Sequence, residues 1–159
     1  MMTEEQPAWN THIRSSSSLR KAPKRHFTDV SLSVAALGAN KKSLLANLNF
    51  TGLLFESLVT HELRVYAQAN DAKVYHYRDS SNLEVDAIIQ KYSGDWCAFE
   101  VKLGTGQIEE AAASLKKFVS ILDDNKVQAP KSLNIITGTG ISYTRNDGIN
   151  VISLASLGA

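Results

Sequence analysis

Apolar positions change their spacing along this chain in a way that separates helices from strands. Between residues 49 and 70 they recur three and four apart, as at Val59, Leu63 and Tyr66, which predicts one long amphipathic helix. The apolar positions of this pattern are Leu53, Leu54, Leu58, Val59, Leu63 and Tyr66. Apolar and polar residues then alternate in runs divided by short polar breaks. This pattern predicts three strands joined as a meander, over 73–78, 83–91 and 95–103.

The helical spacing returns after the third predicted strand. Residues 107–122 place Ala111 and Leu115 on one side of a second amphipathic helix. Two apolar runs follow, at 132–137 and 148–154, and each predicts a strand. Because a helix between strands is typical of a crossover, we expect an α/β fold with a mixed central sheet flanked by helices, in the order α-β-β-β-α-β-β.

The start of the chain shows neither spacing. Residues 1–26 contain two prolines and a serine run, so we expect an irregular or extended lead-in. A short helix is predicted next, with Asp29 or Ser31 as its N-cap and Gly38 at its end. The chain therefore divides into two predicted parts, a basic lead-in over 1–48 and a folded domain over 49–159.

Length and composition limit the class of protein. A chain of 159 residues with 43% apolar and 21% charged side chains is typical of one globular domain, which excludes a fibre or a disordered tail. The single cysteine, Cys97, lies in an apolar strand, where we expect a buried and inert thiol. No apolar run approaches the roughly 20 residues that span a bilayer, and no signal peptide is evident. We expect a cytoplasmic protein without a membrane partner.

The net charge is only +1, but positive charge is concentrated near the start of the chain. Residues 10–28 contain no Asp or Glu and five basic side chains, namely Arg14, Arg20, Lys21, Lys24 and Arg25. Such a segment is able to contact the phosphates of a nucleic acid, and it is equally typical of a solvated surface. Charge alone leaves both interpretations open.

Carboxylates and a lysine alternate with apolar residues in the second and third predicted strands. With a side-chain period of two, one face of this hairpin receives Asp86, Glu100 and Lys102. The opposite face receives Val85, Phe99 and Val101. One or two carboxylates, with water and substrate phosphate oxygens, suffice to hold Mg²⁺ or Mn²⁺. The pattern therefore points to phosphodiester hydrolysis, with Lys102 beside the reacting phosphate and Glu56 of the long helix within reach.

The same residues also have a simpler interpretation. Glu84, Asp86 and Lys102 would form ion pairs across the strands of a solvated sheet face, each worth roughly 0.2 to 1 kcal/mol. Two amphipathic helices flank the hairpin in sequence, however, so both sheet faces are expected to be partly covered. Covered carboxylates without a cation or partner carry a large desolvation cost, which favours a cation site.

A longer set of motifs connects these residues to a known family. The strings are Gly52-Leu53-Leu54-Phe55-Glu56-Ser57-Leu58-Val59, Glu62-Leu63, Tyr77-Arg78-Asp79, Glu84-Val85-Asp86 and Phe99-Glu100-Val101-Lys102-Leu103-Gly104, after Lys21-Ala22-Pro23-Lys24-Arg25-His26-Phe27-Thr28-Asp29. Together they resemble the C-terminal domain, of unassigned function, of prokaryotic AAA-type ATPases. That domain resembles the PD-(D/E)XK nuclease superfamily, which has the restriction-endonuclease-like fold.

The resemblance implies a role for each residue of the cluster. Asp86 and Glu100 correspond to the ligands of a Mg²⁺ or Mn²⁺ ion, Lys102 to the catalytic lysine, and Glu56 to the acid of the helix. The family often has a glycine before its Glu-Val-Asp run. Asn82 stands there in this chain, and asparagine tolerates a left-handed backbone nearly as well.

Contacts to nucleic acid are expected around this cluster. Arg78 follows alternating aromatic residues in a strand, and Gln107 follows a glycine-containing turn. Each has a structural alternative, since such aromatics are more often core residues and a glutamine at a helix start is usually only solvated. The predicted nucleic-acid-binding set is Arg20, Lys21, Lys24, Arg25, Arg78 and Gln107.

The chain contains no Gly-x-x-x-x-Gly-Lys-Ser/Thr loop, so we expect no ATP site and no ATPase activity. The family places an ATPase module before this region. We therefore expect the C-terminal part of a longer protein, or a remnant of one, with an AAA-type ATPase as a partner. The predicted function is metal-dependent hydrolysis of DNA. The alternatives are an inactive or weakly active module of the same fold that binds nucleic acid or a partner, and a structural remnant.

Overall fold

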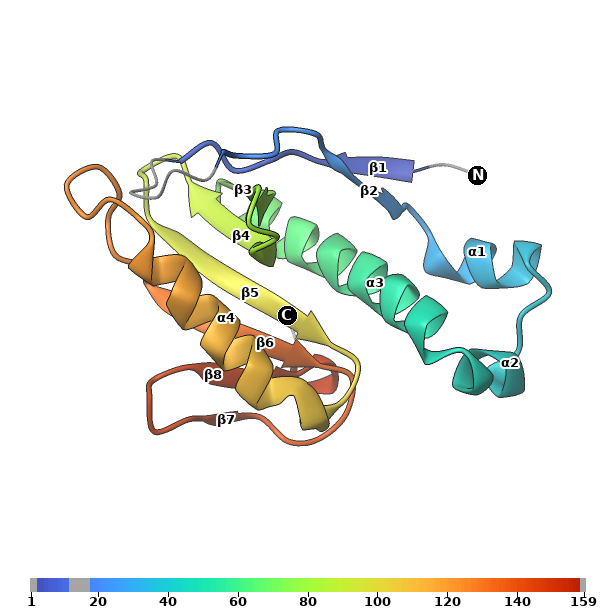
Figure 1. Cartoon of the computed structure of the whole chain (residues 1–159). Coiled ribbons are helices and arrows are strands. Elements are labelled where there is room, and N and C mark those ends of the chain that lie inside the picture. The colour runs from blue at the N-terminus through green and yellow to red at the C-terminus, as the bar shows by residue number, and fades with distance from the viewer. Residues whose placement is uncertain (1–2, 12–17, 158–159) are drawn as a thin grey trace.

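A mixed six-stranded sheet forms the centre of the computed structural model, which describes residues 3–11 and 18–157 (Figure 1). The strand order is β3-β4-β5-β6-β8-β7. Strands β3, β4 and β5 are antiparallel neighbours, β6 and β8 continue the sheet parallel to β5, and β7 is an antiparallel edge. The bounds are β3 Ala72–Arg78, β4 Glu84–Lys91, β5 Trp96–Lys102, β6 Ser132–Thr137, β7 Tyr143–Thr144 and β8 Asn150–Ser153.

One long helix lies on each face of this sheet (Figure 1). Helix α3 (Leu48–Ala69) begins after Asn47, whose side chain accepts a hydrogen bond from Phe50 N. Helix α4 (Ile108–Ser120) follows a 3₁₀ turn, η1 (Thr105–Gln107), and leads from β5 to its parallel neighbour β6. The apolar spacing in the sequence predicts both helices and the meander, and the mixed α/β fold is confirmed.

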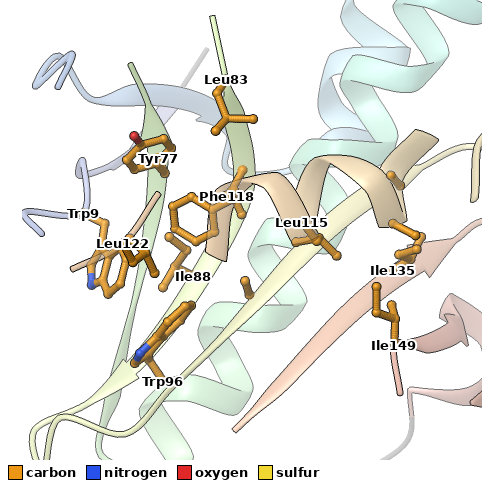
Figure 2. Packing of buried hydrophobic residues seen from close by; sticks show 14 of the residues in the cluster. Trp9, Tyr77, Leu83, Ile88, Trp96, Leu115, Phe118, Leu122, Ile135 and Ile149 are labelled. Atoms are coloured by element: carbon orange, nitrogen blue, oxygen red, sulfur yellow. The ribbon is translucent and has the colours of Figure 1, made fainter. Parts of the chain in front are cut away.

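Buried apolar side chains form a separate core on each side of the sheet. On the α4 side, Leu115 and Phe118 pack against the sheet residues Ile88 and Trp96 (Figure 2). On the α3 side, the buried cluster consists of Phe55, Val59, Leu63, Ala67, Ala72, Val74, Ala87, Phe99, Val101 and Ile136. The sheet is therefore covered on both faces, as expected for the strands that carry the candidate site.

The N-terminal residues form more structure than the irregular lead-in that the sequence predicts. Strand β1 (Thr3–Gln6) pairs antiparallel with β2 (Lys24–Phe27), and the chain after β1 continues along the free edge of β3. There, Trp9 N donates a hydrogen bond to the carbonyl of His76 at 2.7 Å. Strands of four residues are too short to show a period, and their pairing joins segments about twenty residues apart.

Trp9 carries this N-terminal segment into the core on the α4 side (Figure 2). Its side chain is 3% exposed, and its ring centre lies 4.8 Å from that of Trp96 and 6.0 Å from that of Phe118. The indole Nε1 donates a hydrogen bond to Gln90 Oε1 at 2.9 Å. An aromatic side chain of this size buries a large apolar area, so the segment contributes directly to the packing of the sheet.

The short helix predicted after the lead-in is present as α1 (Val30–Ala36). Asp29 is its N-cap, because its carboxylate accepts hydrogen bonds from Ser31 N at 2.8 Å and Leu32 N at 3.3 Å. Gly38 follows the helix with a φ of 59°, a left-handed conformation that favours glycine. Both the capping residue and the end of this helix are therefore predictable from the sequence.

Three features differ from the predicted elements. Helix α2 (Lys41–Ala46) and strand β7 are too short to show a period, so the apolar pattern does not reveal them. Leu53 is 60% exposed although its spacing places it on the apolar face of α3. The reason is that the first turns of α3 extend past the sheet (Figure 1).

Within residues 3–11 and 18–157, no helix is long and apolar enough to cross a membrane.

Candidate active site

An extra residue in β4 shapes the candidate site. Strands β3 and β4 pair Tyr75 with Ile88 and Tyr77 with Val85, so β3 advances two residues while β4 advances three. Strand β4 is therefore bulged around Asp86. A bulge reverses the side-chain alternation beyond it, because one residue no longer counts in the period of two.

The bulge corrects one prediction about the hairpin. A regular strand would place Val85 on the same face as Phe99 and Val101, as the sequence predicts. In the structure Val85 packs in the core on the α4 side, whereas Phe99 and Val101 pack on the α3 side. The grouping of these three residues on one face is wrong, and the extra residue in β4 is the physical reason.

Asp86 makes side-chain and backbone contacts that a regular strand would not provide. Its Oδ2 accepts a hydrogen bond from Val101 N at 2.8 Å, where a backbone carbonyl would accept in an unbulged ladder. Its own carbonyl accepts from Gln6 Nε2 of β1 at 2.9 Å, and the same amide group donates to the carbonyl of Tyr75 at 2.9 Å. Gln6 is completely buried, so β1 fixes the backbone of the bulge.

Glu100 and Lys102 of β5 lie beside Asp86. Glu100 is 4% exposed, its Oε1 accepts a hydrogen bond from Ser114 Oγ at 3.4 Å, and its Oε2 lies 3.1 Å from Lys102 Nζ. Burial, and after it the negative charge of Asp86, raises the pKa of Glu100 to about 8. Burial and then the charge of Glu56 raise the pKa of Asp86. Carboxyl groups that oppose each other's ionisation in a buried site favour a nearby cation.

Lys24 of β2 reaches the same cluster from the N-terminal segment. Its Nζ lies 2.9 Å from Glu56 Oε1, 2.5 Å from Glu84 Oε1 and 3.6 Å from Asp86 Oδ1. Only 23% of the Lys24 side chain is exposed. The sequence assigns Lys24 to a basic segment that contacts phosphate, whereas the structure pairs it with carboxylates of α3 and β4.

The turn before β4 fixes where the strand begins. The buried carboxylate of Asp79 accepts hydrogen bonds from Ser81 N at 2.8 Å, Leu83 N at 3.1 Å and the hydroxyl of Tyr77 at 3.0 Å. Asn82 has a φ of 64°, so the left-handed backbone expected at this position is confirmed. Asp79 is thus a structural residue that holds the turn and directs the chain into the bulged strand.

Buried hydrogen bonds behind the carboxylates join β1, β2 and α3. His26 Nε2 donates to Gln6 Oε1 at 2.8 Å, and Ser57 Oγ donates to His26 Nδ1 at 3.4 Å. These two directions are those of a neutral imidazole that carries its proton on Nε2. Burial, and after it the charges of Lys24 and Arg64, lowers the pKa of His26 to about 4.

The neutral His26 predicts a loss of stability in mild acid. In the unfolded chain this histidine takes up a proton near pH 6.5, and in the folded protein only near pH 4. Its contribution is therefore complete above pH 6.5 and is lost as the pH falls from 6.5 towards 4. Between pH 6.5 and pH 4 this contribution should fall by on the order of 2 kcal/mol, measured by urea denaturation as the difference in the free energy of unfolding between the wild type and His26→Asn. The raised pKa values of Asp86 and Glu100 act in the opposite direction, and the difference removes them because both proteins carry these carboxyl groups.

Two histidine variants test this assignment. Relative to the wild type, His26→Asn should lose less stability as the pH falls from 6.5 towards 4, and His76, whose pKa burial also lowers, acts in both proteins. His61→Asn is the matched control, since it makes the same chemical change at a half-buried histidine of α3 outside this hydrogen-bonded network. An equally steep fall in the His26→Asn protein would contradict the prediction.

Three hollows border the carboxylates. One of about 200 Å³ faces α4, and its wall includes Asp86, Glu100 and Lys102. The larger hollow, of about 900 Å³, faces the first turns of α3, and its wall includes Glu56, Asp86, Lys102 and Gln107. The third, of about 490 Å³, lies against Lys24, and its wall includes Glu56, Glu84 and Asp86. Asp86 therefore borders all three hollows.

Three of the predicted nucleic-acid contacts border this region. Gln107 is exposed in the wall of the larger hollow. Arg78 Nε lies 4.0 Å from Glu84 Oε2, and the exposed Arg20 donates a hydrogen bond from Nη2 to Asn82 Oδ1 at 3.3 Å. Arg78 and Arg20 thus flank the start of β4, two residues before Asp86.

The remaining basic residues are not gathered at the carboxylates. Lys21 and Arg25 are exposed, and Arg25 Nε lies 3.5 Å from Glu5 Oε1 within the β1–β2 pair. Arg14 lies outside the described residues. Among the basic residues of the segment that the structure describes, it therefore brings only Lys24 into the cluster.

Asp86 and Glu100 are the pair that could hold a divalent cation. Among residues 3–11 and 18–157, no group of three or more His, Cys, Asp or Glu side chains is arranged to hold a metal ion. A hard cation bound by two carboxylates would need water or substrate oxygens to complete its coordination. Burial is the main cause of the raised pKa of both carboxyl groups, and a bound dication would offset that cost, so the donor set fits such an ion.

Three contributions to the site are not predicted from the sequence. These are the ion pairs of Lys24, the support of the bulge by Gln6, and the contact of Ser114 with Glu100. Lys24 stands within a string that resembles the family, which is a signal that it has a specific place. Gln6 and Ser114 carry no comparable signal, because a polar residue in a strand or helix is most often on the surface.

The comparisons with known proteins give one family. Residues 51–157 match the family described as "Domain of unknown function (DUF4143)", which is found in AAA-ATPase-associated proteins. Among curated proteins and solved structures, none matches the chain. The match begins after β2, which carries Lys24. It includes the other charged residues of the site, namely Glu56, Glu84, Asp86, Glu100 and Lys102. Since the match covers more than half of the sequence, the chain belongs to the DUF4143 family.

Proposed function

We propose that this domain hydrolyses phosphodiester bonds of DNA with the help of a divalent cation, on a fold of the restriction-endonuclease type. The observation that carries the proposal is the convergence of Asp86, Glu100 and Lys102 at one end of a covered hairpin. The two carboxyl groups lie close enough for the charge of one to raise the pKa of the other, and a lysine lies 3.1 Å from Glu100. The mixed sheet with a helix on each face agrees with the fold that the family resemblance implies.

Each residue has a separate task in this proposal. Asp86 and Glu100 would hold Mg²⁺ or Mn²⁺, which would polarise a phosphoryl oxygen and lower the pKa of a bound water. Lys102 places a positive charge where the attacking water and the charged phosphoryl group would lie. Glu56 acts on Asp86 through its charge, and its contact with Lys24 keeps it next to the cluster.

Exposed basic side chains offer a route for the DNA backbone to this site. Arg20 and Arg78 flank the start of β4, and Lys21 and Arg25 lie on the N-terminal segment. Gln107 borders the larger hollow and is able to contact a nucleotide there. Each phosphate contact releases counterions, so the binding constant should fall steeply with salt concentration. An AAA-type ATPase module is the proposed protein partner, because the family is found in proteins of that kind.

A cleavage assay tests the proposal directly. Purified protein is incubated with supercoiled and with single-stranded DNA in the presence of Mn²⁺, and compared with Asp86→Ala and Lys102→Ala. We expect cleavage that requires Mn²⁺ and is reduced at least about 100-fold in both variants. The matched control is Lys117→Ala, an exposed lysine of α4 away from the site, which should cleave like the wild type. No cleavage by the wild type, or equal cleavage by all proteins, contradicts the proposal.

A second candidate function rests on the ion pairs of the cluster. Lys24 and Lys102 already contact Glu56, Glu84, Asp86 and Glu100. Such pairing is also what a module that binds nucleic acid without turnover would need to keep its acidic residues folded. DNA binding without cleavage, and with the same affinity in Asp86→Ala, would favour this function.

A further inference from the structure

Lys24 is held in place on both sides of its position in β2. Two residues before it, the carbonyl of Ala22 accepts a hydrogen bond from His76 Nε2 at 3.1 Å. Two residues after it, His26 is bonded to Gln6 and Ser57 in the interior. The lysine therefore extends from a fixed backbone, and its place among the carboxylates does not depend on a freely moving surface segment.

The charge balance explains why a lysine remains ionised there. Burial lowers the pKa of Lys24, but the three carboxylates of Glu56, Asp86 and Glu84 together raise it by a larger amount. The pKa of Lys24 therefore lies above its usual value. In return, the contact with Lys24 lowers the pKa of Glu84. One ammonium group thus contacts three carboxylates. Its removal would leave Glu56 and Asp86 without this cation and Glu84 with only the contact to Arg78 at 4.0 Å.

We propose that Lys24 is a positioning residue of the carboxylate site: a built-in counter-cation that holds Glu56, Glu84 and Asp86 together and competes with a divalent metal for Asp86. The inference rests on the proposed function, because it concerns the same metal-binding pair. It adds a regulating element to that site. The element comes from β2, which precedes the residues that match the family.

The competition follows from elementary electrostatics. The Lys24 Nζ lies 3.6 Å from Asp86 Oδ1, so a dication bound at this carboxylate would lie close to an ammonium group. Two like charges at such separations repel each other even in a solvated site. Removal of the lysine charge should therefore tighten metal binding by about tenfold or more, while the metal-free protein loses the partner of three carboxylates.

Metal affinity and metal-free stability are measured on the same set of variants. Lys24→Met keeps the length of the side chain and removes its charge, and Lys24→Gln is a second neutral variant in case the first does not fold. Lys117→Met is the matched control, since Lys117 is an exposed lysine of α4 away from the carboxylates. Calorimetric titration with Mn²⁺ alone gives the dissociation constant, and thermal unfolding in a chelator gives the stability.

We expect the neutral Lys24 variants to bind Mn²⁺ about tenfold or more tightly than the wild type and to melt roughly 5 °C lower without metal. Saturating Mn²⁺ should restore their melting temperature, and Lys117→Met should match the wild type in both measurements. Unchanged or weaker Mn²⁺ binding by a folded Lys24 variant overturns the inference while the metal site of the wild type stands. Absence of Mn²⁺ binding in every protein overturns the inference together with the proposed function.

Discussion

Replacement of Trp9 by alanine should lower the free energy of unfolding by about 3–5 kcal/mol, the range found for large aromatic residues in a core. The side chain is 3% exposed and packs against both Trp96 and Phe118, with ring centres 4.8 and 6.0 Å away. Alanine would leave a cavity beside both rings and would remove the donor to Gln90. Urea denaturation followed by circular dichroism measures the change.

The control for this variant is Tyr92→Ala. Tyr92 is also a large aromatic residue, but it is 77% exposed in the turn between β4 and β5. Its replacement should change stability by no more than about 0.5 kcal/mol. If Trp9→Ala were as mild as Tyr92→Ala, the N-terminal segment would not be packed against the sheet in solution.

Replacement of Gln6 by leucine is expected to cost about 2–4 kcal/mol, because leucine has a similar volume but no hydrogen-bonding group. The carbonyls of Tyr75 and Asp86 would each lose a donor, and His26 would lose its acceptor. All of these groups lie where the side chain of Gln6 excludes water. Urea denaturation measures the loss at neutral pH.

The same Gln6 variant has a consequence for the site. Without the amide of Gln6, the bulged backbone at Asp86 loses the donor that fixes its carbonyl, so cleavage by the folded variant should also fall. Gln68→Leu is the matched control, since Gln68 is exposed on α3 and undergoes the same chemical change. A Gln6→Leu protein as stable as Gln68→Leu would contradict the buried hydrogen-bond network.

The main fold follows from local information in the sequence. The period of apolar residues places α3, α4 and the meander, because each element is long enough to show its spacing. The N-cap at Asp29 is also predictable, since a short polar side chain satisfies free backbone N–H groups. The left-handed backbone at Asn82 is predictable because asparagine tolerates that conformation. The crossover through α4 then follows from the parallel arrangement of β5 and β6.

The environment of the candidate site follows from the sequence only in part. The proximity of Asp86, Glu100 and Lys102 is predicted from alternation, but their surroundings arise from contacts between distant segments. Lys24 approaches Glu84 across sixty residues of chain, and Gln6 approaches Asp86 across eighty, as the numbering shows. No local period in the sequence encodes such pairs. The bulge is not visible in the sequence either, because a single extra residue leaves the spacing of apolar residues in β4 nearly unchanged.

The bulge makes the site sensitive to the deletion of a single residue as well as to substitutions. Loss of the single codon for Ala87 would allow β3 and β4 to pair residue for residue between Ile88 and Val85, and Val85 would still lie opposite Tyr77 on the α4 side. Asp86 would take the place of Ala87 opposite Phe99, so its carboxylate would leave Glu100 and enter the apolar cluster on the α3 side. An in-frame deletion of three nucleotides at this point would therefore be more damaging than most substitutions of the residue it removes.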